Sequence, residues 1–324
     1  MRVSNKMMSR QFLSNLNKLY NDMAYSHKQV STGKAFFKVS DDPINAVKSM
    51  NIKSELQRAD LYESNIKQAV TVLDEQEAGI SHISDSLVEV EGILQQALNE
   101  TYNDNDRESM AQVVEATKEN IISLLNKDYA GKYIFGGYNT ATTPLVKDGG
   151  TYKYNNVDIL DIPNKTVDDI YGNGDTTNLE ISFLNQSMDY NTGKGTKVDV
   201  SLSALEIVGS GSDNLLKRLD DISEELRNPS GDPDALGNFL SETTAFFDDL
   251  QVTRSSVGAK ISNLNMLEDQ IFENKNNLTE LMSKVSEIDI EEAVIDYQTN
   301  QMVYNAALKV GANIIQPTLV DFLR

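Results

Sequence analysis

Histidine is the side chain in this sequence best suited to acid–base or metal chemistry near neutral pH. The chain has two histidines, His27 and His82, and both lie in segments with helical periodicity. His82 falls between the apolar positions Ile80 and Ile83, just off the stripe that they belong to. We therefore interpret both histidines as solvated or flanking helix residues rather than as a base or a metal ligand.

Carboxylates and glycines offer the remaining candidates for a chemical site. The acidic runs "DDISEEL" (220–226) and "EIDIEEA" (287–293) fall on amphipathic helices, where carboxylates usually form a solvated face rather than a metal site. The segment "YGNGDTTN" (171–178) has the spacing of neither a dinucleotide fingerprint nor a phosphate loop, so we interpret it as a turn. The sequence predicts no catalytic residue, no cofactor and no metal.

Composition narrows the classes of partner. The 324 residues include no cysteine and carry a formal net charge of −20. The absence of cysteine excludes disulfides and thiolate chemistry, and the acidic balance without a Lys/Arg cluster argues against nucleic acid. No apolar run approaches the roughly 20 residues of a membrane helix, so we expect no membrane insertion. The start of the chain does not read as a secretory signal, so any export is expected to leave no cleaved leader.

The elements that would position any site are long helices. In the first half, residues with mostly apolar side chains follow one another at alternating spacings of three and four, which is a heptad pattern and predicts a rod of roughly 65 Å. Asp41 and Asp42 suit the cap of this helix and Pro43 its first turn. "ETYNDNDRES" (100–109) is predicted to reverse the chain into a helix over about 107–128. The heptad positions are Ala59, Tyr62, Ile66, Ala69, Leu73, Gln76, Ile80, Ile83, Leu87, Val90, Leu94, Ala97 and Thr101.

The middle of the chain has a different sequence pattern from the helical segments on either side of it. Residues 145–203 lose helical period and read as short strands joined by Gly, Asn and Asp turns. Helix signals return near Asp213 and are predicted to be broken only at "RNPSGDPDALG" (227–237). A second long stripe then predicts a rod that packs on the first. Its members are Leu250, Val257, Ile261, Leu264, Ile271, Leu278, Leu281, Val285 and Ile288.

Both ends of the chain are predicted to be amphipathic helices that need a partner, which could be the other terminus, another subunit or a membrane surface. We interpret Tyr297 and Tyr304 as packing residues rather than as a ligand platform. Pro317 is expected to kink the last helix or to end it near Gln316. The predicted assembly positions are Phe12, Leu16, Leu19, Met23 and Val30 at the start of the chain, and Val294, Tyr297, Tyr304, Leu308, Ile315 and Phe322 at its end.

The fold class predicted from these patterns is mainly α, with long antiparallel, coiled-coil-like rods from the two halves and a small β-rich insertion. The predicted divisions are terminal assembly helices at 1–40 and 290–324, a helical rod domain at 41–137 and 206–289, and an insertion domain at 138–205.

Three stretches resemble bacterial flagellins and hook-associated proteins. "STGKAFFKVSDDPINA" (31–46) resembles the family's loop before its first long helix and contains Gly33, Asp41, Asp42 and Pro43. "YQTNQMVYNAALKVGANIIQPTLVDFLR" (297–324) resembles the family's terminal helix. "GKYIFGGYNTATTPL" (131–145), with Gly136 and Gly137, resembles the members that join the hook to the filament, at the point where a β domain begins.

This resemblance implies a structural protein of the bacterial flagellum, not an enzyme, which connects the hook side to the flagellin filament. It implies that the terminal helices self-assemble as an inner layer in a ring of subunits, with the insertion outermost. The implied partners are other copies of the chain, a hook-side junction protein, flagellin and an export chaperone. The implied location is extracellular, reached through the flagellar secretion apparatus. Flagellin itself, the filament subunit, is the alternative.

Overall fold

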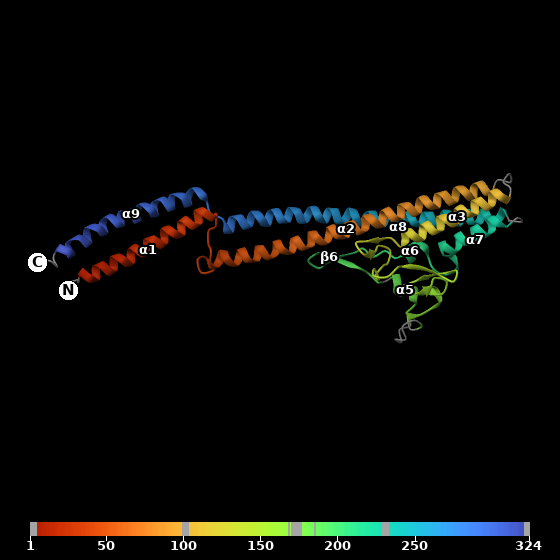
Figure 1. Cartoon of the computed structure of the whole chain (residues 1–324), viewed down its shortest axis with the longest axis horizontal. Helices are drawn as coiled ribbons and strands as arrows, with labels where there is room; N and C mark the ends of the chain where they lie inside the picture. The colour runs from red at the N-terminus through yellow and green to blue at the C-terminus, as the bar shows by residue number, and fades with distance from the viewer. Residues whose placement is uncertain are drawn as a thin grey trace. The chain divides into compact units, whose positions relative to one another are not determined.

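The structure is a computed structural model that describes residues 5–98, 104–167, 169, 177–184, 186–228 and 233–320. It divides into two compact units, which are described separately below (Figure 1). The first unit joins both ends of the chain, residues 1–60 and 272–324, and the second holds residues 61–271. The turn predicted over 171–178 and the heptad position Thr101 lie largely or wholly outside the described residues.

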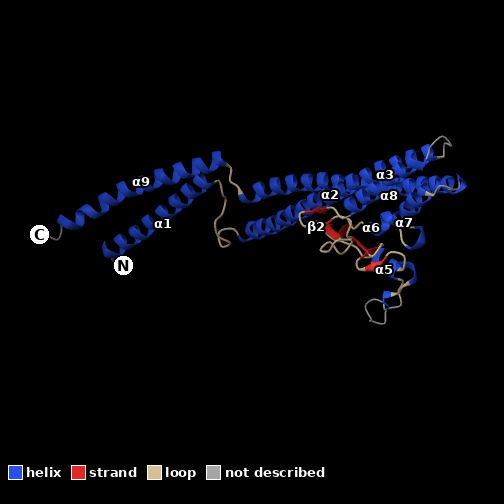
Figure 2. Ribbon diagram, turned by 45° about the vertical axis from the view of Figure 1, so that its right-hand side comes forward, coloured by secondary structure: helices blue, strands red, loops and turns tan. Residues whose placement is uncertain are grey.

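In the first unit, helix α1 (Asn5–Thr32) runs beside helix α9 (Ile290–Val320), and the two ends of the chain lie together (Figures 1 and 2). The unit also holds the start of α2 (Pro43–Ala97) and the end of α8 (Pro233–Ser286). Here the Ser49 hydroxyl donates to the Met282 sulfur at 3.4 Å, and the Lys275 ammonium lies 2.7 Å from the Asp60 carboxylate. The N- and C-terminal halves therefore pair helix by helix.

In the second unit, α2 carries the buried seam that the heptad pattern predicts. The helix begins at Pro43, as expected, and its seam positions from Ile66 to Ala97 are all buried. Helix α3 (Asp104–Leu125) turns back along it, close to the predicted 107–128. The guanidinium of Arg254 on α8 lies 2.6 Å from Glu77 on α2, so α8 covers the seam from another side.

An ion pair between a buried lysine and a half-exposed aspartate joins α3 to α7 (Leu215–Arg227). Lys118 on α3 contacts the Asp220 carboxylate, which also accepts a hydrogen bond from the Tyr152 hydroxyl at 3.3 Å. Burial lowers the pKa of Lys118, but its hydrogen bonds to Asp220 and Tyr152 outweigh burial and raise the pKa overall. The ammonium therefore stays charged and links the rod to the strand that carries Tyr152.

The segment predicted as β-rich contains short antiparallel hairpins (Figure 2). The pairs Gly149–Gly150 and Asn155–Asn156 have positive φ at both residues, which is the backbone of the tight turns expected from "DGG" and "NN". The strands are β1 (Asp128–Tyr129) paired with β2 (Lys132–Tyr133), the sheet β3 (Leu145–Asp148), β4 (Thr151–Tyr154) and β5 (Val157–Asp158), and β6 (Asp189–Gly193) paired with β7 (Thr196–Asp199).

Short helices lie within this segment, where the sequence predicted only strands and turns, and directly after it. Ser203 explains one of them, because its side chain accepts a hydrogen bond from the Glu206 backbone N–H at 3.2 Å and so caps the helix that follows. Buried side chains of the insertion and of the rods form one continuous core. The short helices are η1 (Ile162–Asn164), α5 (Leu179–Leu184), α6 (Ala204–Val208) and η2 (Gly211–Asp213).

The structure excludes one of the two outcomes expected at Pro317, and it shows that one prediction about the helical breaks is wrong. The C-terminal helix does not end near Gln316: α9 continues through Pro317 to Val320, because one missing backbone hydrogen bond does not end a helix whose other turns are intact. The helical region is also broken a second time, between Ser286 and Ile290. There the Asp289 carboxylate accepts from the Glu291 N–H at 2.9 Å, which caps the new helix α9.

Candidate assembly surfaces

The facing sides of α1 and α9 contain most of the predicted assembly positions. Apolar side chains at heptad spacing on each helix pack against the other and lose part of their exposure to solvent. The half-buried positions are Phe12, Leu16, Leu19, Met23 and Val30 on α1 and Val294, Tyr297 and Tyr304 on α9.

Aromatic pairs fix how the two helices face each other. The rings of Tyr20 and Tyr304 lie 6.0 Å apart, and those of His27 and Tyr297 lie 5.4 Å apart. Between them, the Asn300 side-chain amide donates to the Ser26 hydroxyl at 2.9 Å. These contacts confirm that Tyr297 and Tyr304 pack, and they place His27 against an aromatic ring.

Gly311 of α9 leaves space for the aromatic ring of Phe12, a contact that the sequence did not predict. Gly311 is buried, and a Cβ atom built there would lie 2.3 Å from the tip of the Phe12 ring. Only glycine allows the ring to lie this close to the helix backbone. The signal in the sequence was a glycine inside an otherwise strong helix, at a position where glycine costs stability.

The other predicted C-terminal positions are not placed in this seam. Leu308 is 43% exposed, so the contact with α1 does not bury it. Ile315 belongs to the described backbone of α9, but its side chain does not, and Phe322 lies outside the described residues. Their part in assembly stays a prediction.

The two helices differ on the sides that face away from each other. At about 100° per residue, a second apolar stripe on α9 lies roughly opposite its contact with α1. Ile295 and Met302 in this stripe are 63% and 72% exposed. The corresponding side of α1 is mostly polar: Arg10, Ser14, Asn17, Asn21 and Lys28 are exposed there, together with Met7 and Tyr25. We call the exposed stripe formed by Ile295, Met302, Val303 and Val310 the outer face of α9.

The loop that resembles the flagellin family is held by its own acidic residues. The Asp41 carboxylate accepts from the N–H groups of Phe37 and Lys38 at 3.1 and 3.0 Å, and Asp42 accepts from the Asn45 N–H at 3.0 Å. These backbone hydrogen bonds lower the pKa of both carboxyl groups. Asp42 precedes Pro43 at the start of α2, as the capping pattern predicted.

Backbone pairing ties this loop to the junction of α8 and α9. Gly33 ends α1 with a φ of 70°, a conformation that favours glycine, and its carbonyl accepts from the Ile288 N–H at 3.1 Å. The Ala35 N–H donates to the Ser286 carbonyl at 2.9 Å. These two hydrogen bonds join the loop after α1 to the segment between α8 and α9.

Gly136 and Gly137 lie where the chain leaves the rod. The Gly137 N–H donates to the Leu202 carbonyl at 3.3 Å, and the Ala204 N–H donates to the Phe135 carbonyl at 2.7 Å. The outgoing and returning segments are therefore hydrogen-bonded to each other. A Cβ on Gly136 would lie 2.4 Å from a backbone oxygen, and Gly137 has a φ of 61°, so both positions require glycine.

Two residues of α2 hold this crossing against the rod. The Gln76 side-chain amide donates to the Ile134 carbonyl at 2.9 Å and to the Val200 carbonyl at 3.1 Å, so one buried side chain binds both segments. One turn later, Gly79 leaves room for the Phe135 ring, which would lie 2.6 Å from a Cβ at that position. The heptad pattern placed Gln76 in the seam of α2, but it predicted neither the hydrogen bonds of Gln76 nor the space that Gly79 leaves for Phe135.

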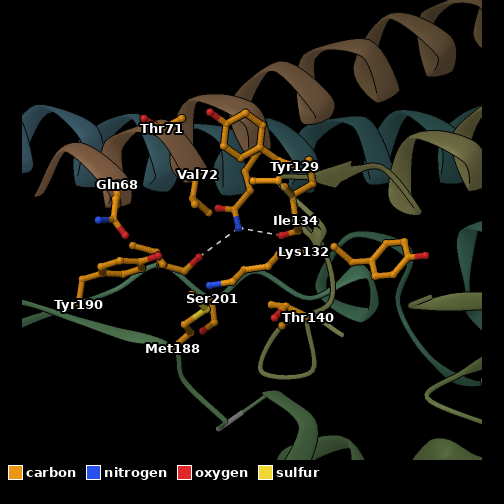
Figure 3. Close-up of a pocket in the computed structure, with 15 residues that line it drawn as sticks. Gln68, Thr71, Val72, Tyr129, Lys132, Ile134, Thr140, Met188, Tyr190 and Ser201 are labelled. Atoms are coloured by element: carbon orange, nitrogen blue, oxygen red, sulfur yellow. Dashed lines mark hydrogen bonds between the residues drawn. The ribbon is translucent and has the colours of Figure 1, made fainter. Parts of the chain in front are cut away.

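A pocket with a volume of about 220 Å³ lies beside this crossing (Figure 3). Dashed lines in Figure 3 mark the two hydrogen bonds from Gln76, and the Lys132 side chain points toward Ser201. Its lining includes no Asp, Glu or His, so the pocket lacks an acid–base pair. In the described part of the chain, no cluster of possible metal ligands occurs, and no helix has the length and apolar character to cross a membrane.

Comparison with known proteins places these features in a family. Residues 3–140 match the family model described as the bacterial flagellin N-terminal helical region. Flagellar hook-associated protein 3 from Escherichia coli (strain K12) is 23% identical over 320 residues, which cover 95% of this chain and 95% of that protein.

Solved structures share the fold. A putative flagellar hook-associated protein from Vibrio parahaemolyticus is 24% identical and aligns with a TM-score of 0.61 over 76% of this chain and 100% of that chain. The flagellar junction protein FlgL from Legionella pneumophila is 12% identical and aligns with a TM-score of 0.54 over 75% of this chain and 100% of that one.

The close approach of the Phe135 ring to Gly79 predicts that alanine substitutions at two glycines of α2 change stability in opposite directions. Gly79→Ala is expected to destabilise the protein by about 1–2 kcal/mol, because the new methyl group displaces the Phe135 ring. Gly92→Ala is the matched control, since nothing lies within 4 Å of its added Cβ. We expect it to stabilise α2 by about 0.5–1 kcal/mol. Denaturant unfolding followed by circular dichroism measures both, and equal effects would contradict this close approach.

The carboxylates of Asp41 and Asp42 predict a loss of stability in acid. Their pKa values are lowered in the folded chain, so their contribution is present above the unfolded pKa of about 4 and is lost as the pH falls through the lower folded values. The D41N/D42N variant should melt at a lower temperature at pH 7 and depend less on pH between 5 and 2. The control is Asp85→Asn, at an exposed position of α2. A wild-type pH profile in the double variant would contradict this assignment.

Proposed function

The chain belongs to the flagellar hook-associated protein 3 family of the flagellins, and we propose that it joins the hook to the filament by assembling through its terminal helices. As a member of this family it is a structural component of the flagellum and not an enzyme. The likeness to a protein described as a flagellar junction protein supports the junction position. The alternative within the family is flagellin, the filament subunit.

The outer face of α9 is the observation that carries this proposal. A helix with apolar side chains on opposite sides is stable in water when both sides are covered. Packing on α1 covers one side, and no described residue of the chain covers the side that holds Ile295 and Met302. A single chain therefore presents a surface that another protein molecule must bury, which is what a subunit of an assembly requires.

The proposed arrangement places the terminal helices, 1–40 and 290–324, in an inner layer. The rods, 41–137 and 206–289, lie outside it and the insertion, 138–205, outermost. Other copies of the chain would form a ring, with a hook-side junction protein on one side and flagellin on the other. We propose that the chain reaches this extracellular place through the flagellar secretion apparatus, with a chaperone bound beforehand and without a cleaved signal peptide.

A charge at an exposed apolar position of α9, on its outer face at Met302 or outside that face at Leu308, should prevent assembly without unfolding the chain. Met302→Asp and Leu308→Asp put a carboxylate on surfaces proposed to be buried between subunits, at a cost of about 2–4 kcal/mol per contact. Asn21→Asp, on the polar side of α1, adds the same charge where no burial is proposed. Electron microscopy should find few filaments on hooks with the first two variants and normal numbers with the third. Normal filament numbers with Met302→Asp would contradict the role of this face.

Deleting the gene tests the junction position itself. Cells without the protein should make hooks that carry no filaments and release flagellin into the medium, and the wild-type gene should restore the filaments. Attached filaments in the deletion strain would refute the proposed function.

A further inference from the structure

The pocket beside the crossing is lined largely by apolar and aromatic side chains of the second unit (Figure 3). Its lining includes Val72 on α2, Ile134 and Val200 at the crossing, and the rings of Tyr129 and Tyr190. Its volume of about 220 Å³ is several times the space that one water molecule needs. Tyr129 is 43% exposed, so the pocket opens to solvent beside this ring. A group from another molecule can therefore enter it.

Gln76 supplies a hydrogen-bond acceptor that no described residue uses. This side chain lines the pocket and is only 1% exposed. Its Nε2 group donates both hydrogens, to the carbonyls of Ile134 and Val200, whereas its Oε1 atom accepts no hydrogen bond from the described residues. A buried acceptor without a donor costs stability. Because both Nε2 hydrogens are held, the amide cannot turn over, and only a donor can satisfy it.

The rest of the lining suits an aromatic ring. Tyr129, Tyr133 and Tyr190 can meet a flat ring by its face or its edge, and the Met188 sulfur makes favourable contacts with ring edges. The Lys132 side chain also lines the pocket, and its ammonium can lie over the face of a bound ring. The lining contains no carboxylate, so a cationic ligand would find no counter-ion there. These groups together favour an uncharged aromatic group that carries a hydrogen-bond donor.

We propose that the pocket binds the indole ring of a tryptophan side chain from a partner protein. The indole N–H only donates, which matches the Oε1 acceptor of Gln76, and indole gives the strongest cation–π attraction among aromatic side chains. Tryptophan that fills a pocket is also typical of the residues that contribute most to protein interfaces. The chain itself contains no tryptophan, so the partner is a different protein. The site lies at the crossing and is separate from the terminal helices proposed for assembly.

Fluorescence tests the site on the purified full chain, because a protein without tryptophan adds no indole emission of its own. N-acetyl-tryptophanamide represents the side chain in a protein, and free indole represents a small molecule. We expect N-acetyl-tryptophanamide to bind saturably, with its emission shifted to the blue by the apolar walls. Its ring-N-methyl derivative, which lacks the N–H group, should bind about tenfold more weakly. Equal affinities would show that Oε1 of Gln76 is not the acceptor and would overturn the assignment.

Variants of the chain locate the bound ring. Lys132→Gln removes the ammonium from the lining and should weaken binding about two- to fivefold. Lys194→Gln makes the same change at an exposed position outside the lining and should leave binding unchanged. Val72→Phe fills the pocket and should abolish binding while the helical circular-dichroism signal is retained.

Three results would overturn the proposal. Equal effects of the two lysine variants, or unchanged binding to folded Val72→Phe, would place the ring elsewhere. Saturable binding of neither probe would remove the site. Binding of free indole without N-acetyl-tryptophanamide would overturn the protein source of the ring. The junction function does not depend on any of these results, because the deletion strain tests it separately.

Discussion

The structure depends on one constraint: each half of the chain carries apolar stripes that only the other half can cover. The seam of α2 is too long for α3 alone, and α8 returns along it from the far end of the sequence. The same requirement pairs α1 with α9, where Phe12 enters the space left by Gly311. Because the partners are far apart in sequence, the chain must fold back on itself before either rod is stable.

Because the two halves of the chain pair along the rods, the middle of the chain leaves the rods and returns to them at one place. The outgoing and returning segments meet at Phe135–Gly137 and Leu202–Ala204, and Gln76 binds both. One buried amide therefore fixes where the insertion joins the rod, and Gly79 fixes how closely Phe135 approaches it. The insertion then shares its buried core with the rods, and the Lys118–Asp220 pair adds a further link.

Local patterns were sufficient to predict most of the long helices, but not the short ones or the break between α8 and α9. The seam of α2, its start at Pro43 and the capping by Asp42 all depend on residues within a few turns of one another, and the structure confirms them. The roles of Gln76, Gly79 and Gly311 could not be found in this way, because their partners lie 56 to 299 positions away. The outer face of α9 was missed for another reason: a helix that is apolar on several sides fits more than one heptad stripe, and Leu308 fell between them.

Pairing between the halves covers one side of α9 and leaves Ile295 and Met302 on the other side exposed, and the proposal that the protein is a junction subunit rests on this asymmetry. Gold-labelled antibody against the insertion, applied to intact flagella, measures where the subunit lies. If the protein is a junction subunit, the label is confined to a narrow band where the hook meets the filament. Label along the whole filament would contradict it and would identify the chain as the filament subunit.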